Sequence, residues 1–423
     1  MLLIRTEQIK IPYNSELSNL CHLSKNLWNE ANYLCRQSYF HNLKHPEDSV
    51  KIHSSGDLNQ LLKQSENYKQ LNAQSAQQTL KILDKDWTSY WESIKEYNKN
   101  PSKFLGIPNL PHYKPKNGEH TLIFTNQQCH IRNHILTLTK KLPLRIKTRL
   151  SGKINQIRFI PKGEGYICEI VYDKTIKRQT ERQIICQRWY SKIKKSNNNY
   201  LGIDYGVSNI VTIGDNIGST PIVIKDNGIG IKTINQFYNK QKALLQSIYD
   251  KQNIKCGTKM SRLNEKRHRK MEDSMHKISR FIINECIKNN IETIIIGHND
   301  GWKQHSNLGK VTNQKFVTIP FNTLTKIIQY KAEEEGISVI LQDEGHTSKC
   351  SFLDSEPIKH REVYLGKRIT RSLFKSADGT IIHSDVNGVY NIITKAKPDA
   401  FMADGVGGCG LHPIRMNPLR SNN

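Results

Sequence analysis

The order of apolar strands and polar helices in the second half of the chain constrains the fold more than any other feature. Short β-branched runs predict strands, and longer runs with an apolar spacing of three and four predict helices. In chain order we expect strands at about 200–206, 210–213 and 221–224, a helical stretch at about 233–289, a strand at 293–296, a helix at about 320–335 and a strand at 336–342. This alternation predicts an α/β domain, whose functional site is expected where the parallel strands end.

The order βββ-α-β-α-β is that of the RNase H-like α/β class. We therefore predict such a domain over residues 200–396, with a turn-rich insertion at 345–384 and a last helix that begins near Asp385. The Gly- and Pro-rich tail, 397–423, is expected to be poorly ordered.

Residues 1–175 predict a second, β-rich domain that carries a helical insertion at about 15–100. Gly163-Glu164-Gly165 predicts a hairpin turn, and the expected strands are 1–12 and about 120–126, 134–140, 154–161 and 165–173. A basic and polar stretch, 176–199, is interpreted as the linker between the two domains.

The charge of the chain indicates its kind of partner. There are 63 Lys and Arg against 38 Asp and Glu, which gives a net charge of +25 and a pI near 9.6. Nucleic acid is the first candidate, because neutralising phosphates releases counterions, whereas charge spread along the chain disfavours a membrane. The nine cysteines form no CxxC pair and no apolar run approaches the ~20 residues of a membrane span, so we expect a cytoplasmic protein with reduced thiols.

Two aspartates follow the pattern of a metal site. Asp204 comes after an apolar strand and before Gly206, and Asp385 stands at the start of the last helix. Singly, Asp204 would suit a turn and Asp385 a helix N-cap. Together, in this strand order, they indicate carboxylates that converge on Mg²⁺, since two-metal phosphodiester hydrolysis needs several such oxygen ligands around ions about 3.5–4 Å apart.

Several segments in a fixed order make the chain similar to TnpB proteins, which are transposon-encoded RNA-guided DNA nucleases related to type V CRISPR effectors. The segments are "GIDYGVSNIVTI", the basic helical region, the strand at 293–296, "TSKCS" and "DVNGVYNI". The resemblance covers residues 200–395 well and residues 1–175 in architecture only. It implies a RuvC-like site with an Asp on the first strand, a Glu at the tip of the fourth and an Asp before the last helix. Asp204 and Asp385 match this pattern, but the Glu position holds Gly297.

Three explanations for Gly297 compete. The nuclease is inactive, or Asp300 supplies the acid, or the acid comes from Asp343-Glu344 at the end of the next strand. The fourth and fifth strands of such a sheet are parallel neighbours ~4.8 Å apart, so a Glu after the fifth reaches nearly the same point. Glycine at 297 then clears room for it, and "DEGHTSKCSFLD" resembles the subgroup of TnpB relatives whose glutamate has moved. We choose Glu344, with Asp343 as the second choice and an exposed acidic turn as the alternative without function.

The insertion departs from the zinc ribbon that the resemblance implies. Two CxxC pairs would give four thiolates for zinc. Only Cys350 is present, because Leu353 occupies its partner position and Lys375 and Asp378 replace the second pair. His346, His360 and His383 add no ligand spacing, so zinc is not expected, and a Lys375–Asp378 pair is expected to help close the knuckle.

Basic residues in two segments are candidates for nucleic-acid contacts. By resemblance, the helix at 262–280 faces the guide–target heteroduplex or the guide scaffold and reads backbone shape. The Trp87–Trp91 aromatic cluster is interpreted as helix core rather than as a stacking platform for bases. The candidate contact residues are Arg262, Lys266, Arg267, Arg269, Lys270, Lys367, Arg368 and Arg371.

The resemblance thus implies an RNA-guided DNA endonuclease in which Asp204, Glu344 and Asp385 hold two Mg²⁺ ions, with Mn²⁺ as a substitute. A β-barrel-like wedge domain with a helical recognition insertion would hold a guide RNA derived from the transposon end and read a short motif beside the double-stranded DNA target. We expect a monomer that acts at the nucleoid of a prokaryotic cell. The alternatives are an RNA-guided repressor without cleavage, a DNA-joining transposase and a RuvC-like nuclease that needs no RNA.

Overall fold

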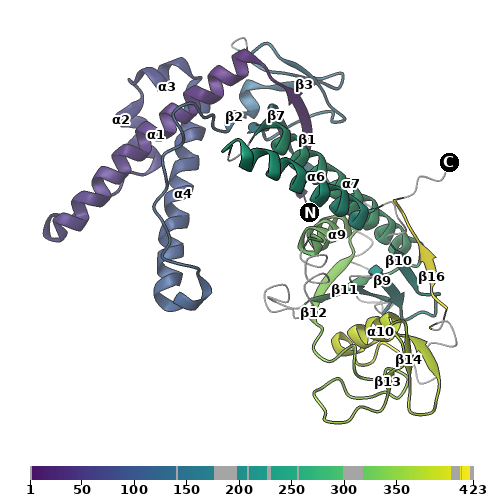
Figure 1. The fold of residues 1–423 in the computed structure, drawn as a ribbon. Coiled ribbons are helices and arrows are strands. Elements are labelled where there is room, and N and C mark those ends of the chain that lie inside the picture. Colours follow the sequence, from purple (N-terminus) through teal and green to yellow (C-terminus); the bar gives the residue numbers. More distant parts are fainter. Residues whose placement is uncertain are drawn as a thin grey trace, which may run out of the picture. The chain divides into compact units, whose positions relative to one another are not determined.

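The computed structural model describes residues 2–139, 142–175, 198–206, 209–225, 230–254, 257–298, 318–401, 410 and 412–419. The chain divides into two compact units, residues 2–174 and 175–423, and each is described by itself (Figure 1). Most of the predicted linker lies outside the described residues. No helix in the described part of the chain combines the length and the apolar character that a bilayer crossing needs.

Two small sheets form the β part of the N-terminal unit. One has the strand order β1 (Leu2–Pro12), β7 (Gly165–Thr175), β6 (Gln156–Lys162) and β2 (Leu122–Thr125), and the other has the order β3 (His130–Arg132), β4 (Ile135–Thr137) and β5 (Arg145–Lys147). The predicted hairpin is confirmed, because β6 and β7 pair up to Lys162 and Gly165 around Gly163, whose φ is 63°. The sequence did not indicate β3 and β5, which are too short to show a pattern. The barrel-like arrangement stays a prediction.

The other regular elements among the described residues of the N-terminal unit are four helices and three short 3₁₀ turns. The helices are α1 (Ser15–Lys44), α2 (Ser55–Leu62), α3 (Glu66–Gln70) and α4 (Ala73–Lys99), and the turns are η1 (Pro46–Asp48), η2 (Pro101–Lys103) and η3 (Asn126–Gln128). Serines are the N-cap residues of two of these helices. The Ser54 hydroxyl accepts a backbone N–H in the first turn of α2, and the Ser65 hydroxyl does so in α3. In the predicted aromatic core cluster, Trp87 is buried, but Trp91 is 42% exposed, so the interpretation is wrong for Trp91.

A six-stranded sheet organises the C-terminal unit and confirms the predicted RNase H-like order. Its strands are β12 (Ser338–Asp343), β11 (Thr293–His298), β8 (Tyr200–Tyr205), β9 (Asn209–Asp215), β10 (Ile222–Lys225) and β16 (Ile414–Met416). β8, β11 and β12 are mutually parallel, and β9 is antiparallel to β8. Disorder throughout the tail 397–423 was a wrong expectation, because β16 pairs in parallel with β10 and the Ile414 N–H donates to the Pro221 carbonyl at 2.8 Å.

Helices cover both faces of this sheet (Figure 1). They are α6 (Ile231–Lys251), α7 (Thr258–Lys288), α9 (Phe321–Glu334) and α10 (Ser384–Ala396). Ile294 and Ile296 of β11 pack with α7 and α9, whereas Ile295 packs with α10. Because side chains alternate along a strand, this central strand is apolar on both faces, and each buried isoleucine stabilises the fold by about 1.5–3 kcal/mol.

Two sequence predictions for this unit need correction. The helical stretch at about 233–289 is two helices, which are separated around Gly257, the N-cap residue of α7. The insertion at 345–384 contains a small antiparallel sheet that the sequence did not indicate, made of β13 (Lys367–Arg368), β14 (Leu373–Lys375) and β15 (Ile381–His383). The small sheet depends on strand pairing that a short local pattern does not show.

Candidate metal centre

Asp204 lies near the carboxyl end of β8, on the side of the sheet that faces α10. Leu201, Ile203 and Tyr205 alternate toward the core with α7 and α9, so Gly202 and Asp204 lie on the opposite face. Gly388 of α10 brings the helix backbone close, since a Cβ atom at that position would lie 3.2 Å from Asp204 Oδ2.

Glu344 follows the last residue of β12, beside the tip of β11. The register pairs Gly297 with Gln342 and His298 with Asp343. A Cβ atom on Gly297 would lie 2.7 Å from both Cγ and Cδ of Glu344 and would also meet its Oε1. The expectation that Gly297 makes room for the Glu344 side chain is therefore confirmed.

Asp385 belongs to the first turn of α10 and is not its N-cap. The cap is His383, whose Nδ1 accepts the Asp385 N–H at 3.3 Å, so the N-cap interpretation of Asp385 is wrong. Asn209, at the start of β9, donates from Nδ2 to Asp385 Oδ2 at 2.6 Å. Arg368 of the insertion donates from Nη2 to Asp385 Oδ1 at 3.3 Å. Each carboxylate oxygen of Asp385 thus has a donor from a different element.

The three carboxylates are close enough for their charges to interact. Burial raises the pKa of Asp204 well above its usual value, and the charges of Glu344 and Asp385 raise it further, whereas Arg368 opposes the shift. Burial, with a smaller contribution from Asp343, raises the pKa of Glu344 to about 7. Such shifts are typical of acids held together in a functional site.

Asp343 is turned to a different partner. Its Oδ2 accepts from Lys395 Nζ at 2.7 Å and from the Gly345 N–H at 3.1 Å. The hydrogen bond with Lys395 is the main reason that the pKa of Asp343 is lowered. Asp343 is therefore the less suitable of the two adjacent acids, and the third candidate, Asp300, lies outside the described residues.

The donor set suits a hard divalent cation. Three carboxylates supply oxygen ligands, and a cation would relieve the repulsion that raises the pKa of Asp204. Among the described residues, however, no three His, Cys, Asp or Glu side chains are already arranged as a metal cluster. The carboxylate oxygens are ligands that suit Mg²⁺, and the three side chains would have to move closer together to bind it.

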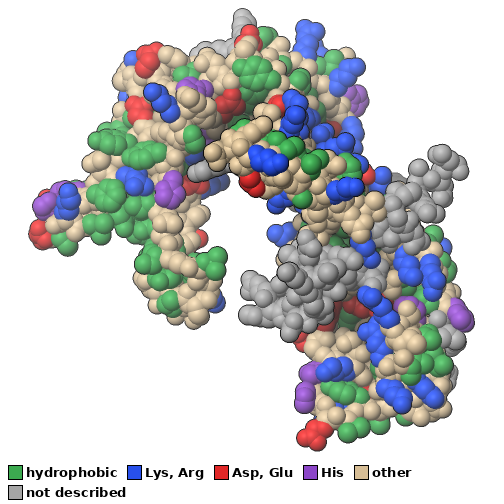
Figure 2. All heavy atoms as spheres, in the orientation of Figure 1, with side chains coloured by type: hydrophobic (Ala, Val, Ile, Leu, Met, Phe, Trp, Pro, Cys, Tyr) green, Lys and Arg blue, Asp and Glu red, His purple; other side chains and the backbone are tan. Residues whose placement is uncertain are grey.

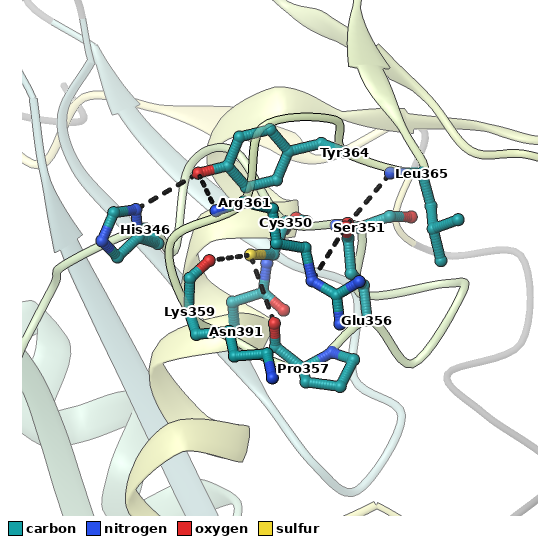
Figure 3. A network of polar contacts seen from close by, with 10 residues as sticks. All are labelled: His346, Cys350, Ser351, Glu356, Pro357, Lys359, Arg361, Tyr364, Leu365 and Asn391. Atoms are coloured by element: carbon teal, nitrogen blue, oxygen red, sulfur yellow. Dashed lines mark hydrogen bonds and ion pairs between the residues drawn. The ribbon is translucent and has the colours of Figure 1, made fainter.

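Hydrogen bonds close the knuckle of the insertion (Figure 3). The buried carboxylate of Glu356 accepts the N–H groups of Ser351 at 2.8 Å and Leu365 at 3.1 Å, and it pairs with Arg361 at 3.8 Å. The Cys350 thiol donates to the carbonyls of Pro357 and Lys359 at 3.7 and 3.8 Å.

The predicted Lys375–Asp378 closure is wrong. Asp378 instead bonds with Ser376 and Thr380 next to it in the chain. Leu353 does not pack inside the knuckle either, because it is exposed. Of the three histidines considered as zinc ligands, His346 and His360 have ring centroids 5.5 Å apart, while His383 caps α10.

The predicted nucleic-acid residues of α7 differ in their surroundings. Lys266 and Lys270 are exposed and line a hollow of about 220 Å³ between α6 and α7, beside Phe237. Arg267 is held in place, since it donates from Nε to Asn235 at 2.8 Å. Arg269 pairs with Glu265 at 3.8 Å. Arg262 is exposed on the same helix.

In the insertion, Lys367 and Arg371 are exposed, whereas Arg368 contacts Asp385 and the Arg371 carbonyl. Figure 2 shows Lys and Arg side chains over many parts of the surface, in keeping with the net charge. Arg368 therefore lies at the acid site. For Lys367 and Arg371 the predicted contact with nucleic acid stays a prediction.

The sequence did not indicate Asn209 or the contact of Arg368 with Asp385. Asn209 is the polar first residue of β9, directly before the apolar Ile210 and Val211, and that position was an available signal. The Arg368 contact depends on how the insertion folds back over α10, for which the sequence held no signal.

Two family models match the chain. A family described as a probable transposase, OrfB of IS605, matches residues 176–303, and the Cas12f1-like TNB domain matches residues 321–392. TnpB-like protein ORF457 of Acidianus two-tailed virus is 25% identical over 429 residues, which cover 92% of this chain and 87% of that protein. TnpB-like protein MJ0751 of Methanocaldococcus jannaschii is 26% identical over 157 residues, which cover 35% of this chain and 54% of that protein.

Solved structures show a weaker likeness. A Cas12f1–sgRNA–target DNA complex has a TM-score of 0.49 at 13% identity, over 90% of this chain and 83% of that one. A CRISPR-Cas12f ternary complex has a TM-score of 0.35 at 13% identity, over 88% and 81%.

The six-stranded sheet has the RNase H-like strand order, and the three acids lie at its edge, in a chain whose residues 176–303 match a probable transposase family. The family models and the TnpB-like relatives confirm the resemblance found in the sequence. Over these two ranges and in its TnpB-like relatives, the chain is similar to the TnpB family.

Proposed function

We propose that this protein is an RNA-guided DNA endonuclease in which Asp204, Glu344 and Asp385 form the active site. The observation that supports this most is the Glu344 side chain, which fills the space left by Gly297 and interacts with the charge of Asp204. A neighbouring strand thereby supplies the third carboxylate, so the missing glutamate of β11 is no argument against catalysis.

The residues of the site have separable tasks. Asp204, Glu344 and Asp385 would hold two Mg²⁺ ions, which when bound supply charge that activates water and stabilises the leaving 3′ oxygen. Mn²⁺ is expected to substitute, because it also accepts carboxylate ligands. Hydrolysis forms a bond from the water oxygen to phosphorus and breaks the bond to the 3′ oxygen. No protein nucleophile takes part, and Asn209 keeps Asp385 oriented through its 2.6 Å hydrogen bond.

Arg368 has a task that follows from its position. Its guanidinium offsets the charge of Asp385 and lowers the pKa of Asp204. A cation beside the acids is also suited to bind a phosphate oxygen of the DNA backbone, because guanidinium groups match phosphate geometry.

Guide RNA and double-stranded target DNA are the proposed partners. The solved Cas12f1 complex contains sgRNA and target DNA, and the net charge of +25 suits two polyanions. The N-terminal unit would hold the guide, which would derive from the transposon end, and would read a short motif beside the target. Lys266 and Lys270 are proposed contacts for the guide, since both are exposed and line the same hollow.

Plasmid cleavage tests the proposal directly. RNA that copurifies with the protein is sequenced to define the guide, and a matching plasmid is incubated with the complex and Mg²⁺. We expect the wild type to cut, and Asp204→Ala and Glu344→Ala to lose cutting while they retain RNA. Asp343→Ala is the matched control, because Asp343 pairs with Lys395, and it should cut as the wild type does.

The second candidate is an RNA-guided repressor without cleavage. One observation favours it, namely that no metal cluster is preformed among the described residues. A wild-type complex that binds its target tightly but leaves the plasmid intact in Mg²⁺ and in Mn²⁺ would select the repressor.

A further inference from the structure

Helix α10 is linked to all three proposed acids, to two of them directly. Asp385 is in its first turn, and Gly388 lies against Asp204. The link to Glu344 is indirect and runs through Asn387 and Asn391, whose side chains are 0% and 2% exposed. Neither asparagine takes part in the mechanism described above.

The turn after β12 holds the backbone of Glu344. The Glu344 carbonyl accepts the Thr347 N–H at 3.1 Å and the Thr347 hydroxyl at 2.9 Å. Glu344 itself lies beyond the last pair of the β11–β12 ladder, His298 with Asp343. The sheet therefore holds the residue before Glu344, and other contacts must hold the turn that carries it.

The two asparagines supply those contacts. Asn391 donates from Nδ2 to the carbonyls of Thr347 and Cys350, both at 2.8 Å. Asn387 donates to the Cys350 carbonyl at 2.9 Å and accepts the Phe352 N–H at 2.9 Å. Residues four apart on a helix share a face, so one face of α10 binds both ends of the segment 347–352. A buried amide without hydrogen-bond partners destabilises the folded state, so both asparagines favour the arrangement in which these bonds form.

We propose that Asn387 and Asn391 are positioning residues, which latch the turn that carries Glu344 onto the helix that carries Asp385. This inference rests on the proposed function. A glutamate at a strand tip would be held by the sheet itself, whereas a glutamate on a turn needs this latch. The same hydrogen bonds attach the start of the insertion to α10.

The test measures metal affinity without nucleic acid or turnover. Mn²⁺ is titrated into the purified protein and free Mn²⁺ is followed by electron paramagnetic resonance, for the wild type, Asn391→Ala and Asn387→Ala/Asn391→Ala. We expect the variants to bind Mn²⁺ roughly ten- to a hundredfold more weakly, which is the usual effect of losing a residue that orients a metal ligand. Wild-type affinity in a folded double variant would overturn the proposal.

Asn216→Ala is the matched control. Asn216 also holds backbone groups, since it accepts the Tyr200 N–H at 2.7 Å and donates to the carbonyls of Asn198 and Ala400, both at 2.8 Å. These contacts lie at the end of β8 opposite to Asp204. We expect a comparable loss in Tm with unchanged Mn²⁺ affinity. An equal loss of affinity in the control would mean that Asn387 and Asn391 act through general stability, and it would overturn the proposal.

Two more variants keep the outcome interpretable. Asn391→Ser retains one donor, so it should fold and show an intermediate affinity even where the double variant does not fold. Asp204→Ala separates this inference from the proposed function. If Asp204→Ala binds Mn²⁺ as the wild type does, the metal site itself is wrong, whereas loss in Asp204→Ala alone rejects only the latch.

Discussion

Gly297 and Glu344 share one volume at the carboxyl ends of two neighbouring parallel strands. A side chain at 297 and the present conformation of Glu344 exclude each other, because even a Cβ atom would approach the glutamate to 2.7 Å. At the scale of single residues, the site is therefore a property of the pair, and neither position can be interpreted alone.

Gly297→Ala should displace the Glu344 carboxylate. A misplacement of about 1 Å costs about a hundredfold in rate, so we expect a loss of plasmid cleavage of this size with an intact fold. The double variant Gly297→Glu/Glu344→Ala moves the acid to the tip of β11 and should cut better than Glu344→Ala. Wild-type cleavage by Gly297→Ala would contradict the steric argument.

His120 of the N-terminal unit predicts a pH effect on stability. Burial first, and then the charge of Lys114, lowers the pKa of His120 to about 4. Between pH 6.5 and 4 the unfolded chain binds a proton at this residue that the folded chain does not, so the free energy of unfolding falls as the pH falls. The Tm difference between the wild type and His120→Gln should shrink from pH 7 to pH 5. A difference that does not change with pH would contradict this assignment.

At the scale of elements, α10 carries Asp385 and packs against Asp204 at Gly388. Gly388→Ala should favour the helix by about 0.5–1 kcal/mol, yet its Cβ presses on the carboxylate at 3.2 Å. We expect an unchanged or higher Tm and roughly tenfold slower cleavage. Gly56→Ala in α2 is the control, since its Cβ meets only Ser54 Oγ at 3.7 Å, and it should leave cleavage unchanged.

The knuckle of the insertion predicts a metal-independent fold. Glu356 and the Cys350 thiol are bonded to backbone groups of the knuckle itself. A strong zinc chelator should leave the Tm unchanged, and elemental analysis should find no stoichiometric zinc, whereas removal of Mg²⁺ should stop cleavage. A Tm that falls with the chelator would show that a metal supports the fold.

The elements that the sequence predicted are those with a burial pattern of their own. β11 could be predicted because Ile294, Ile295 and Ile296 are buried on both faces. The choice of Glu344 combined the resemblance with the adjacency of parallel strands, and its role stays a prediction. β13 and β16 could not be predicted, because two or three exposed residues become strands only through their partners. The same holds for the contact of Arg368 and for the asparagines of α10, which depend on distant parts of the chain.

At the scale of the whole molecule, the surplus of Lys and Arg predicts binding that depends on salt. Replacing Lys266 or Lys270 with Gln should lower the affinity for guide RNA and reduce the slope of log K against log salt by about one each. Lys277→Gln is the control, because Lys277 already pairs with Asp273 at 2.8 Å. Equal slopes for all three variants and the wild type would exclude α7 from RNA binding.

Strand β16 has a consequence for how the protein is handled and trimmed. It covers the outer edge of β10, which would otherwise present unpaired N–H and C=O groups to the solvent. A chain shortened ahead of Ile414 would open that edge, and exposed edges recruit strands from other molecules. Aggregation of such a truncated protein would then result from the exposed edge of β10. A truncated protein that fails to cut DNA for this reason would not test the role of the three acids.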